Sequence, residues 1–170
     1  MAPIDDRSEP AALGEFGGFE IYPMPMFATL SAADVSALAA WYGEALGFKT
    51  VFAAPAAGGQ PSLVHLRRRK YQDLLIVPSA DSGQPATNLT LSFNADGEID
   101  ALAEQARSRA PAGRSAVVGP VDTPWNTRDL RVTDPVGTRL VFTARNLNPD
   151  PEQAARMKAL FEAARGEGPI

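Results

Sequence analysis

The chain has 170 residues, a formal net charge of −4 and no cysteine, and His65 is its single histidine. These counts exclude disulfide frameworks, thiolate metal sites, cysteine nucleophiles and any site that needs two histidine ligands from one chain. The acidic balance makes nucleic acid a poor partner, and no apolar run approaches the roughly 20 residues that span a membrane. Because the acidic N-terminus also lacks the apolar core of a secretory signal, we expect a soluble cytoplasmic protein.

The first half of the sequence predicts an irregular leader followed by one α/β module. Residues 1–22 contain charged and turn-forming residues without periodicity, which is typical of a loose leader. A strand is expected at 26–32, then a helix that Asp34 caps and that Gly47 ends. Strands are expected at 48–53, 62–67 and 74–77. The basic run 67–70 is interpreted as a solvated turn between the last two of them. The predicted order is β-α-β-β-β.

The second half repeats this order. A strand is expected at 88–93, a helix from Ile99 with Asp96 as its N-cap, and strands at 115–118, 130–132 and 138–143, the last two joined by a turn at 134–137. A further helix begins at Asp150 and Pro151. Its apolar face comprises Met157, Leu160, Phe161 and Ala164.

Matching spacings indicate an internal duplication. Thr29-Leu30-Ser31 recurs as Thr90-Leu91-Ser92, 61 residues later (90 − 29). The helical stripes are 64 residues apart (99 − 35), and the last strands are 65 apart (140 − 75). Because the elements match in order as well as in spacing, we predict one domain at 23–146 made of modules 23–82 and 83–146. Residues 147–170 are then an added C-terminal helix.

Two groups of motifs carry a family resemblance. Asp34, Trp41-Tyr42 and Leu46-Gly47-Phe48 match a D…FY…LGF pattern. Pro124-Trp125-Asn126, Arg128 and the run DPVGTRLVF at 134–142 match PWG…DPxGxxLxF. Residues 24–144 therefore resemble the vicinal oxygen chelate superfamily, which includes glyoxalase I, extradiol dioxygenases and bleomycin resistance proteins. The resemblance implies an α+β fold in which tandem βαβββ modules with curled mixed sheets form a pocket. It also implies a homodimer, to which the added helix offers apolar surface.

In the metal-dependent members of that family, four positions on the first and last strands of the modules hold a divalent ion through His, Glu or Gln. The resemblance places these positions at Phe27, Ile76, Asn88 and Val141, with a shift of one residue allowed at Ile76. The separation of Phe27 from Asn88 (88 − 27 = 61) equals the offset of the repeat. Three of these residues have no metal-binding atom, and one amide oxygen is a poor anchor. The sequence therefore resembles the metal-free, bleomycin-resistance-like branch, and we expect no metal and no cofactor.

The first functional hypothesis is metal-independent binding of an aromatic or antibiotic-like small molecule, with resistance by sequestration. Apolar walls, an aromatic stacking surface, an amide and a cation are the groups that such a pocket uses. The predicted ligand-binding residues are Phe27, His65, Ile76, Asn88, Trp125, Arg128 and Val141, and no catalytic residue is assigned. Two alternatives stay open: a metal-free lyase or isomerase that uses His65 or Asp73 as a base, and an interaction module whose barrel is filled by its own side chains.

Overall fold

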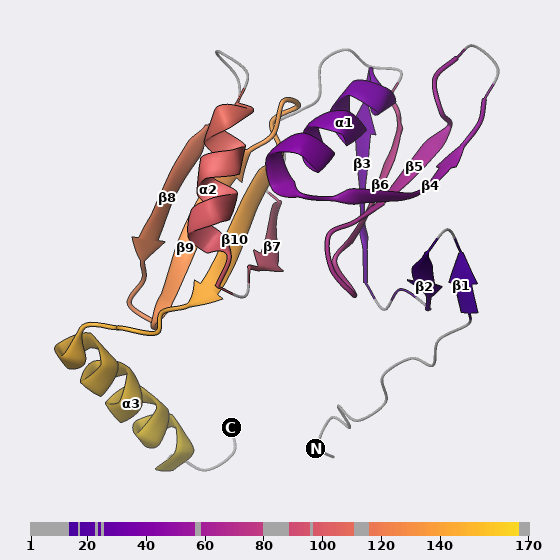
Figure 1. Cartoon of the computed structure of the whole chain (residues 1–170). Coiled ribbons are helices and arrows are strands. Elements are labelled where there is room, and N and C mark those ends of the chain that lie inside the picture. Colours follow the sequence, from indigo (N-terminus) through magenta and orange to yellow (C-terminus); the bar gives the residue numbers. More distant parts are fainter. Residues whose placement is uncertain are drawn as a thin grey trace. The chain divides into compact units, whose positions relative to one another are not determined.

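The structure is a computed structural model that describes residues 14–16, 18–22, 24, 26–56, 59–79, 89–95, 97–110 and 116–166. The chain divides into two compact units, residues 1–82 and 83–170. The division falls at the boundary between the two predicted modules. Each unit contains one βαβββ module, and the second also carries a C-terminal helix, so the fold is α+β (Figure 1).

The first unit contains a small hairpin and one four-stranded sheet. Its elements are β1 (Gly14–Phe16), β2 (Phe19–Ile21), β3 (Ala28–Ala32), α1 (Val35–Leu46), β4 (Lys49–Ala54), β5 (Leu63–Arg67) and β6 (Asp73–Pro78). The sheet has the strand order β3-β6-β5-β4. β3 runs parallel to β6, and the other neighbours are antiparallel. α1 covers one face of this sheet (Figure 1).

Local signals set the two ends of α1, as the sequence predicts. The Asp34 carboxylate accepts a hydrogen bond from the Ala37 backbone N–H at 2.8 Å, which satisfies one of the free donors of the first turn. Gly47 ends the helix in the left-handed conformation with φ 72°, where a side chain would be strained. Its N–H donates to the Gly43 carbonyl at 3.1 Å.

The core of the first unit lies between α1 and the sheet. Alternate residues of the strands are buried on the face toward α1, because successive side chains of a strand point to opposite faces. They pack with the buried side of α1, where Val35 and Tyr42 are 0% exposed. The buried strand residues on this face are Leu30, Ala32, Val64, Leu66, Leu74 and Ile76.

The prediction of a loose leader is wrong for the described residues between 14 and 22. Gly14–Phe16 pairs with Phe19–Ile21 as an antiparallel hairpin. Tyr22 is 5% exposed and contacts the turn between β5 and β6. The periodicity test misses this segment because one anchoring aromatic residue and three-residue strands are too short to produce a pattern.

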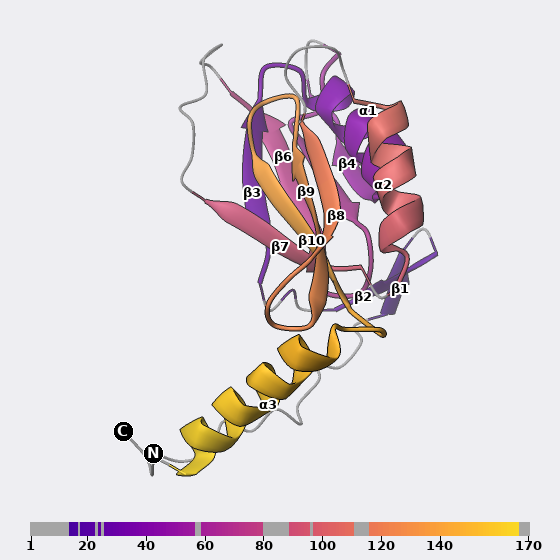
Figure 2. The same ribbon diagram turned by 90° about the vertical axis from the view of Figure 1, so that its left-hand side faces the viewer.

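The second unit repeats the architecture of the first. Its elements are β7 (Thr90–Asn94), α2 (Ile99–Ser108), β8 (Val117–Asp122), β9 (Thr127–Thr133), β10 (Arg139–Arg145) and α3 (Pro151–Gly166). The sheet order is β7-β10-β9-β8, with β7 parallel to β10 (Figure 2). Phe93 and Phe142 stack at 5.3 Å within its core. Glu98 precedes α2 without a side-chain cap, and the predicted cap Asp96 lies outside the described residues.

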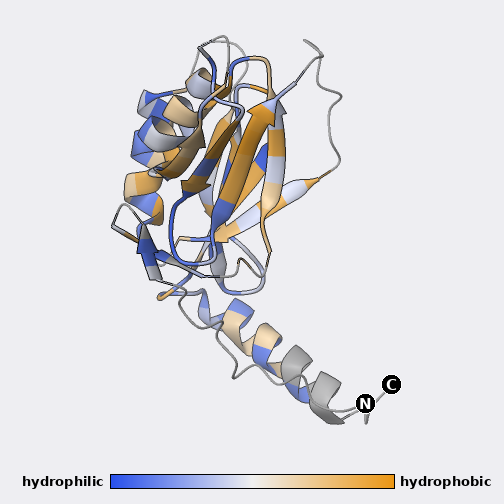
Figure 3. Ribbon diagram, turned by 90° about the vertical axis from the view of Figure 1, so that its right-hand side faces the viewer, coloured by the Kyte–Doolittle hydropathy of each residue, from blue (hydrophilic) through white to orange (hydrophobic). Residues whose placement is uncertain are grey.

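α3 begins as the sequence predicts. Asp150 accepts from the Gln153 N–H at 3.0 Å, and the Gln153 side chain donates to the Thr123 carbonyl. Apolar residues dominate the strands, whereas polar and apolar residues alternate along the first turns of α3 (Figure 3). Met157 is half-buried, and the side chains of Leu160, Phe161 and Ala164 lie outside the described set. Within the described ranges, none of the helices is both long and apolar enough to cross a bilayer.

Candidate functional site on the distal face of the first sheet

The face of the first sheet that points away from α1, called here the distal face, carries a row of side chains across all four strands. Strand pairing places Thr29 beside Leu75, Leu75 beside His65, and His65 beside Phe52. A register shift between Thr50 and Phe52 in β4 brings Phe52 opposite His65. Phe52 is 43% exposed and the His65 side chain 15% exposed. The row therefore presents one aromatic ring, one aliphatic group, one hydroxyl and the only imidazole.

His65 also belongs to a hydrogen-bonded cluster outside this row, which contains Asp73, Arg67 and Tyr22. Its Nε2 lies 2.7 Å from Asp73 Oδ1, and Arg67 Nε donates to the same oxygen at 2.8 Å. Tyr22 donates its hydroxyl hydrogen to Asp73 Oδ2 at 2.8 Å. The Asp73 side chain is 0% exposed, so its charge is balanced by these three neighbours rather than by water.

Tyr22 and Arg67 are themselves fixed by further contacts. The Tyr22 hydroxyl oxygen accepts from the Tyr71 backbone N–H at 2.6 Å, and the two tyrosine rings meet edge to face at 4.8 Å. The Arg67 guanidinium lies 4.1 Å from the centre of the Tyr22 ring and donates to the Glu20 carbonyl at 2.7 Å. The segment before β3 thus ties the cluster to the rest of the unit.

These surroundings shift two acid–base equilibria in opposite directions. Burial alone would raise the pKa of Asp73, but the hydrogen bonds from His65, Arg67 and Tyr22 together lower it below its ordinary value of 3.8. Burial, with the neighbouring Asp73 charge, raises the pKa of Tyr22 from 10.0 to about 12. Near neutral pH the cluster therefore contains an ionised Asp73 and a protonated Tyr22.

The structure corrects two predictions, the place of Ile76 in the binding site and the place of Arg67 in a solvated turn. Ile76 is 0% exposed on the face toward α1, so it belongs to the core and cannot line a pocket. Its neighbour Leu75 occupies the distal face, because a shift of one residue along a strand exchanges the two faces. Arg67 is also no part of a solvated turn: it ends β5, is 8% exposed and binds Asp73.

Arg128 is engaged within its own unit. Its guanidinium donates twice to Asp100 of α2, at 2.7 and 3.1 Å, and its Nε lies 3.3 Å from Asp122. Arg128 therefore lies on the α2 side of the second sheet, with Leu130 and Val132, and not on the opposite face. Asp100 and Asp122 pair with the Arg128 guanidinium, which the sequence predicts to bind a ligand. The hydrogen bonds with Asp100 are the main cause that raises the pKa of Arg128 above its ordinary value.

The remaining predicted residues lie on different parts of the chain. Phe27 precedes β3 and is 45% exposed, and Trp125, in the turn before β9, is 59% exposed. Val141 is half-buried on the face of the second sheet away from α2, in a row with Ser92 and Arg131. Asn88 lies outside the described residues. Phe27 lies in the first unit with His65, whereas Trp125 and Val141 lie in the second unit.

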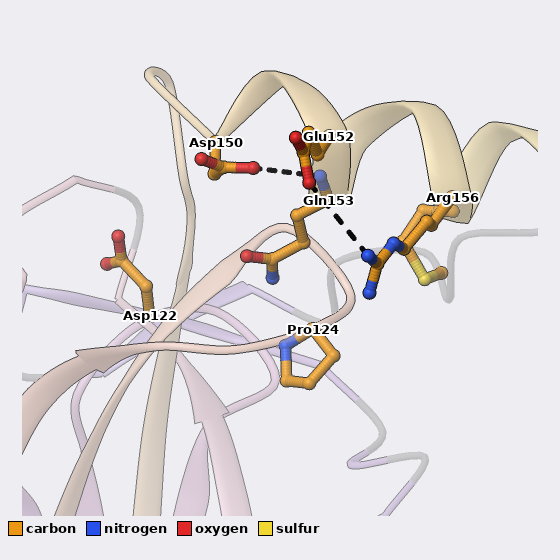
Figure 4. Close-up of a pocket in the computed structure, with 7 residues that line it drawn as sticks. Asp122, Pro124, Asp150, Glu152, Gln153 and Arg156 are labelled. Atoms are coloured by element: carbon orange, nitrogen blue, oxygen red, sulfur yellow. Dashed lines mark hydrogen bonds and ion pairs between the residues drawn. The ribbon is translucent and has the colours of Figure 1, made fainter.

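A pocket of about 490 Å³ lies between the start of α3 and the turn after β8 (Figure 4). None of the predicted site residues lines it. Its carboxylates already have partners: Asp122 pairs with Arg128, Asp150 caps α3, and Glu152 pairs with Arg156 at 3.9 Å. The lining residues are Asp122, Pro124, Asp150, Glu152, Gln153, Arg156 and Met157. This pocket therefore belongs to the packing of α3 and is not the candidate site.

The residues present do not fit the divalent ion that the fold family implies. Phe27 and Val141 have no ligating atom, and Ile76 lies in the core. Across the described ranges, no three His, Asp or Glu side chains gather where they could share an ion. His65 and Asp73 are close, but they bind each other and Arg67.

The comparisons with known proteins agree with this architecture. The profile of the Glyoxalase/Bleomycin resistance protein/Dioxygenase superfamily matches residues 26–142, and the chain belongs to that superfamily. Among curated protein sequences no significant match is found.

Solved structures with the same fold include TioX from Micromonospora sp. ML1, with 20% identity and a TM-score of 0.57 over 71% of this chain and 97% of TioX. The bleomycin-binding protein from Streptomyces verticillus, solved with copper(II)-bleomycin, has 23% identity and a TM-score of 0.54 over 73% of this chain and 98% of its own. At these sequence identities, the similarity shows that this chain shares the fold of the two proteins and nothing further.

Sequence reasoning finds His65 and Asp73 as candidate bases but misses Tyr22, Arg67 and Phe52 as their neighbours. The alternation of His65 and Arg67 along β5 could have placed both on one face. No sequence signal connects Tyr22 to Asp73, because they are 51 residues apart and meet only through the fold.

Proposed function

We propose that this chain is a metal-independent protein that binds an aromatic or antibiotic-like small molecule on the distal face of its first sheet. The observation that carries the proposal is the row Thr29, Leu75, His65 and Phe52, which crosses all four strands. Small-molecule sites combine apolar and aromatic walls with a few fixed polar groups. Phe52 and Leu75 supply the walls, and His65 is a polar group held in place by Asp73.

The donor chemistry supports binding without a metal. The positions that hold an ion in metal-dependent relatives carry Phe27 and Val141, whose side chains provide surface instead of ligation. Phe27, in the same unit as the row, is 45% exposed, so its ring is available for stacking.

The proposal is tested by calorimetry and thermal shift with bleomycin and with flat aromatic antibiotics. We expect a subset to bind, and we expect Phe52→Ala to weaken that binding about tenfold, or about 1.4 kcal/mol. Leu147→Ala is the matched control, because it truncates an apolar side chain that is 78% exposed in the second unit. Absence of any binding heat, or equal losses in both variants, contradicts the proposal.

A metal-free lyase or isomerase is the second candidate function. The observation that favours it is the 2.7 Å contact between His65 and the buried Asp73, since a carboxylate that orients an imidazole is a common arrangement for a general base. His65→Gln and Asp73→Asn would then each abolish turnover of a substrate. Unchanged turnover in both variants removes this candidate.

We also propose a homodimer. The outer strand β8 and the turn after it expose Val118, Val121 and Trp125, which are 53%, 42% and 59% exposed. Apolar surface of this kind is commonly covered by a partner. Light scattering that gives a monomer mass at micromolar concentration contradicts this proposal.

A further inference from the structure

We propose that His65 is fixed with its proton on Nε2, so that Nδ1 accepts a hydrogen bond from the ligand and selects aromatic molecules that carry a hydroxyl or N–H donor, such as phenols. This inference rests on the proposed binding function and names the chemistry of the ligand. It follows from three features of the cluster around Asp73.

First, the Asp73 carboxylate serves only as an acceptor. Arg67 Nε–H donates to Oδ1 at 2.8 Å, and an arginine has no acceptor to offer in return. The Tyr22 oxygen already accepts from the Tyr71 N–H, so its own hydrogen points to Oδ2 at 2.8 Å. A proton on Asp73 would compete with these donors and would leave the buried Arg67 charge without its counterion.

Second, an ionised Asp73 determines which nitrogen of His65 is protonated. Nε2 lies 2.7 Å from Oδ1, and a carboxylate without a proton can only accept. Nε2 must therefore carry the hydrogen. Because a neutral imidazole has one N–H, Nδ1 is then an acceptor. Among the residues that the structure describes, Nδ1 has no hydrogen-bond partner.

Third, the neighbours of His65 in the row provide no donor that could satisfy Nδ1 in place of a ligand. Leu75 and Phe52, on the adjacent strands, are apolar. A ring packed against Phe52 lies beside the imidazole and brings a ring substituent to it. A phenolic O–H then pairs with Nδ1, whereas a methyl ether covers the nitrogen without a hydrogen bond, which costs binding free energy.

The tautomer is tested by two-bond ¹H–¹⁵N correlation spectra of the whole chain at about pH 8, above the ordinary range of imidazole titration. His65 is the only histidine, so the spectrum contains one imidazole and needs no assignment by mutation. We expect the pattern of the Nε2–H form. The pattern of the Nδ1–H form, or of a doubly protonated ring, overturns the inference.

Asp73→Asn supplies a second readout, because an amide can either accept from Nε2–H or donate to Nε2. We expect the two nitrogen shifts of His65 to move toward averaged values in this variant. Retention of the wild-type pattern would show that Asp73 does not select the tautomer. If Asp73→Asn does not fold, the wild-type spectrum alone decides.

The ligand class is tested with 2-naphthol and 2-methoxynaphthalene, which differ only in the donor. We expect the naphthol to bind about tenfold more tightly and to shift the Nδ1 resonance. His65→Leu should remove this preference. Equal affinities, preference for the ether, or no binding of either probe overturns the assignment of the ligand class.

The two proposals fail separately. Binding of aromatic antibiotics with the wrong tautomer overturns this inference and leaves the binding function intact. The expected tautomer without any bound aromatic antibiotic overturns the binding function instead.

Discussion

His65 Nε2 and Asp73 Oδ1 lie 2.7 Å apart on the adjacent strands β5 and β6, and the Asp73 side chain is 0% exposed. This contact joins the one imidazole of the chain to a carboxylate that three side chains share. It gives the distal face a polar group whose orientation is set before any ligand arrives.

Asp73→Asn should destabilise the protein by about 3 kcal/mol, because it leaves the buried Arg67 guanidinium without its counterion. Urea unfolding measures the change. Asp122→Asn is the control: Asp122 also pairs with an arginine, but its side chain is 58% exposed, so its loss should cost under about 1 kcal/mol. Similar losses of unfolding free energy in the two variants would show that burial does not strengthen the pair of Asp73 and Arg67.

The contribution of Asp73 should depend on pH in one direction. Its pKa is lowered in the folded state, so its stabilisation is complete above the unfolded value of 3.8 and is lost as pH falls through the folded pKa. The difference in unfolding free energy between wild type and Asp73→Asn should therefore shrink only below about pH 4. A difference that shrinks between neutral pH and pH 5 contradicts the ionised cluster.

Tyr22→Phe should lower stability by about 1–2 kcal/mol, because Asp73 Oδ2 and the Tyr71 N–H each lose a partner. Tyr71→Phe is the matched control in the same ring pair. The buried Tyr71 hydroxyl oxygen has no hydrogen-bond partner among the described residues, so its removal should be nearly neutral. A larger loss in Tyr71→Phe than in Tyr22→Phe would contradict this arrangement.

The Tyr22 hydroxyl should also ionise at a higher pH than that of an ordinary tyrosine. Its folded pKa is raised from 10.0 to about 12, so its stabilisation is complete below pH 10 and declines as pH rises from there toward 12. The tyrosinate absorbance of wild type minus that of Tyr22→Phe should report a titration near pH 12. A difference titration near the ordinary value of 10.0 would show that Tyr22 is exposed to solvent.

The register of β6 predicts unequal effects at two adjacent positions. Ile76→Ala removes a side chain that is 0% exposed in the core and should cost about 3 kcal/mol. Leu75→Ala truncates a half-buried side chain on the distal face and should cost about 1 kcal/mol while weakening ligand binding. Thermal and urea unfolding check the order. A larger loss of stability in Leu75→Ala than in Ile76→Ala would place Ile76, and not Leu75, on the distal face.

The pairing of β8 with β9 shifts register between Val118 and Val121, and Gly119 lies within this irregularity. Its φ is 99°, and a Cβ atom there would lie 2.5 Å from the Asp129 carbonyl oxygen. Gly119→Ala should therefore destabilise the second unit by about 2 kcal/mol or more, since backbone must move. Gly137→Ala is the control, because it has a similar φ of 95° but open space around the new atom. Equal losses of stability in the two variants would show that the positive φ, and not the contact with the Asp129 carbonyl, destabilises Gly119→Ala.

Local patterns in the sequence were sufficient for the order of the elements in the two βαβββ modules and for α3, but not for the β1–β2 hairpin. Asp34 and Gly47 delimit α1, and the repeated tripeptide at 29–31 and 90–92 falls in β3 and β7. The motifs at 34–48 and 124–142 carry the family, which the match over residues 26–142 shows. These features depend on neighbours a few positions away, so one sequence contains them in full.

Tertiary structure decided which residues meet. Ile76 and Leu75 exchange faces through one step of register, and Arg128 reaches Asp100, 28 positions away in the chain. Tyr22 joins Asp73 because the fold brings together two residues that are 51 positions apart in the chain. Hydrophobic periodicity determines that a strand exists and has an inner face. The pairing of separate strands, through distant hydrogen bonds and packing, determines which side chains that face holds.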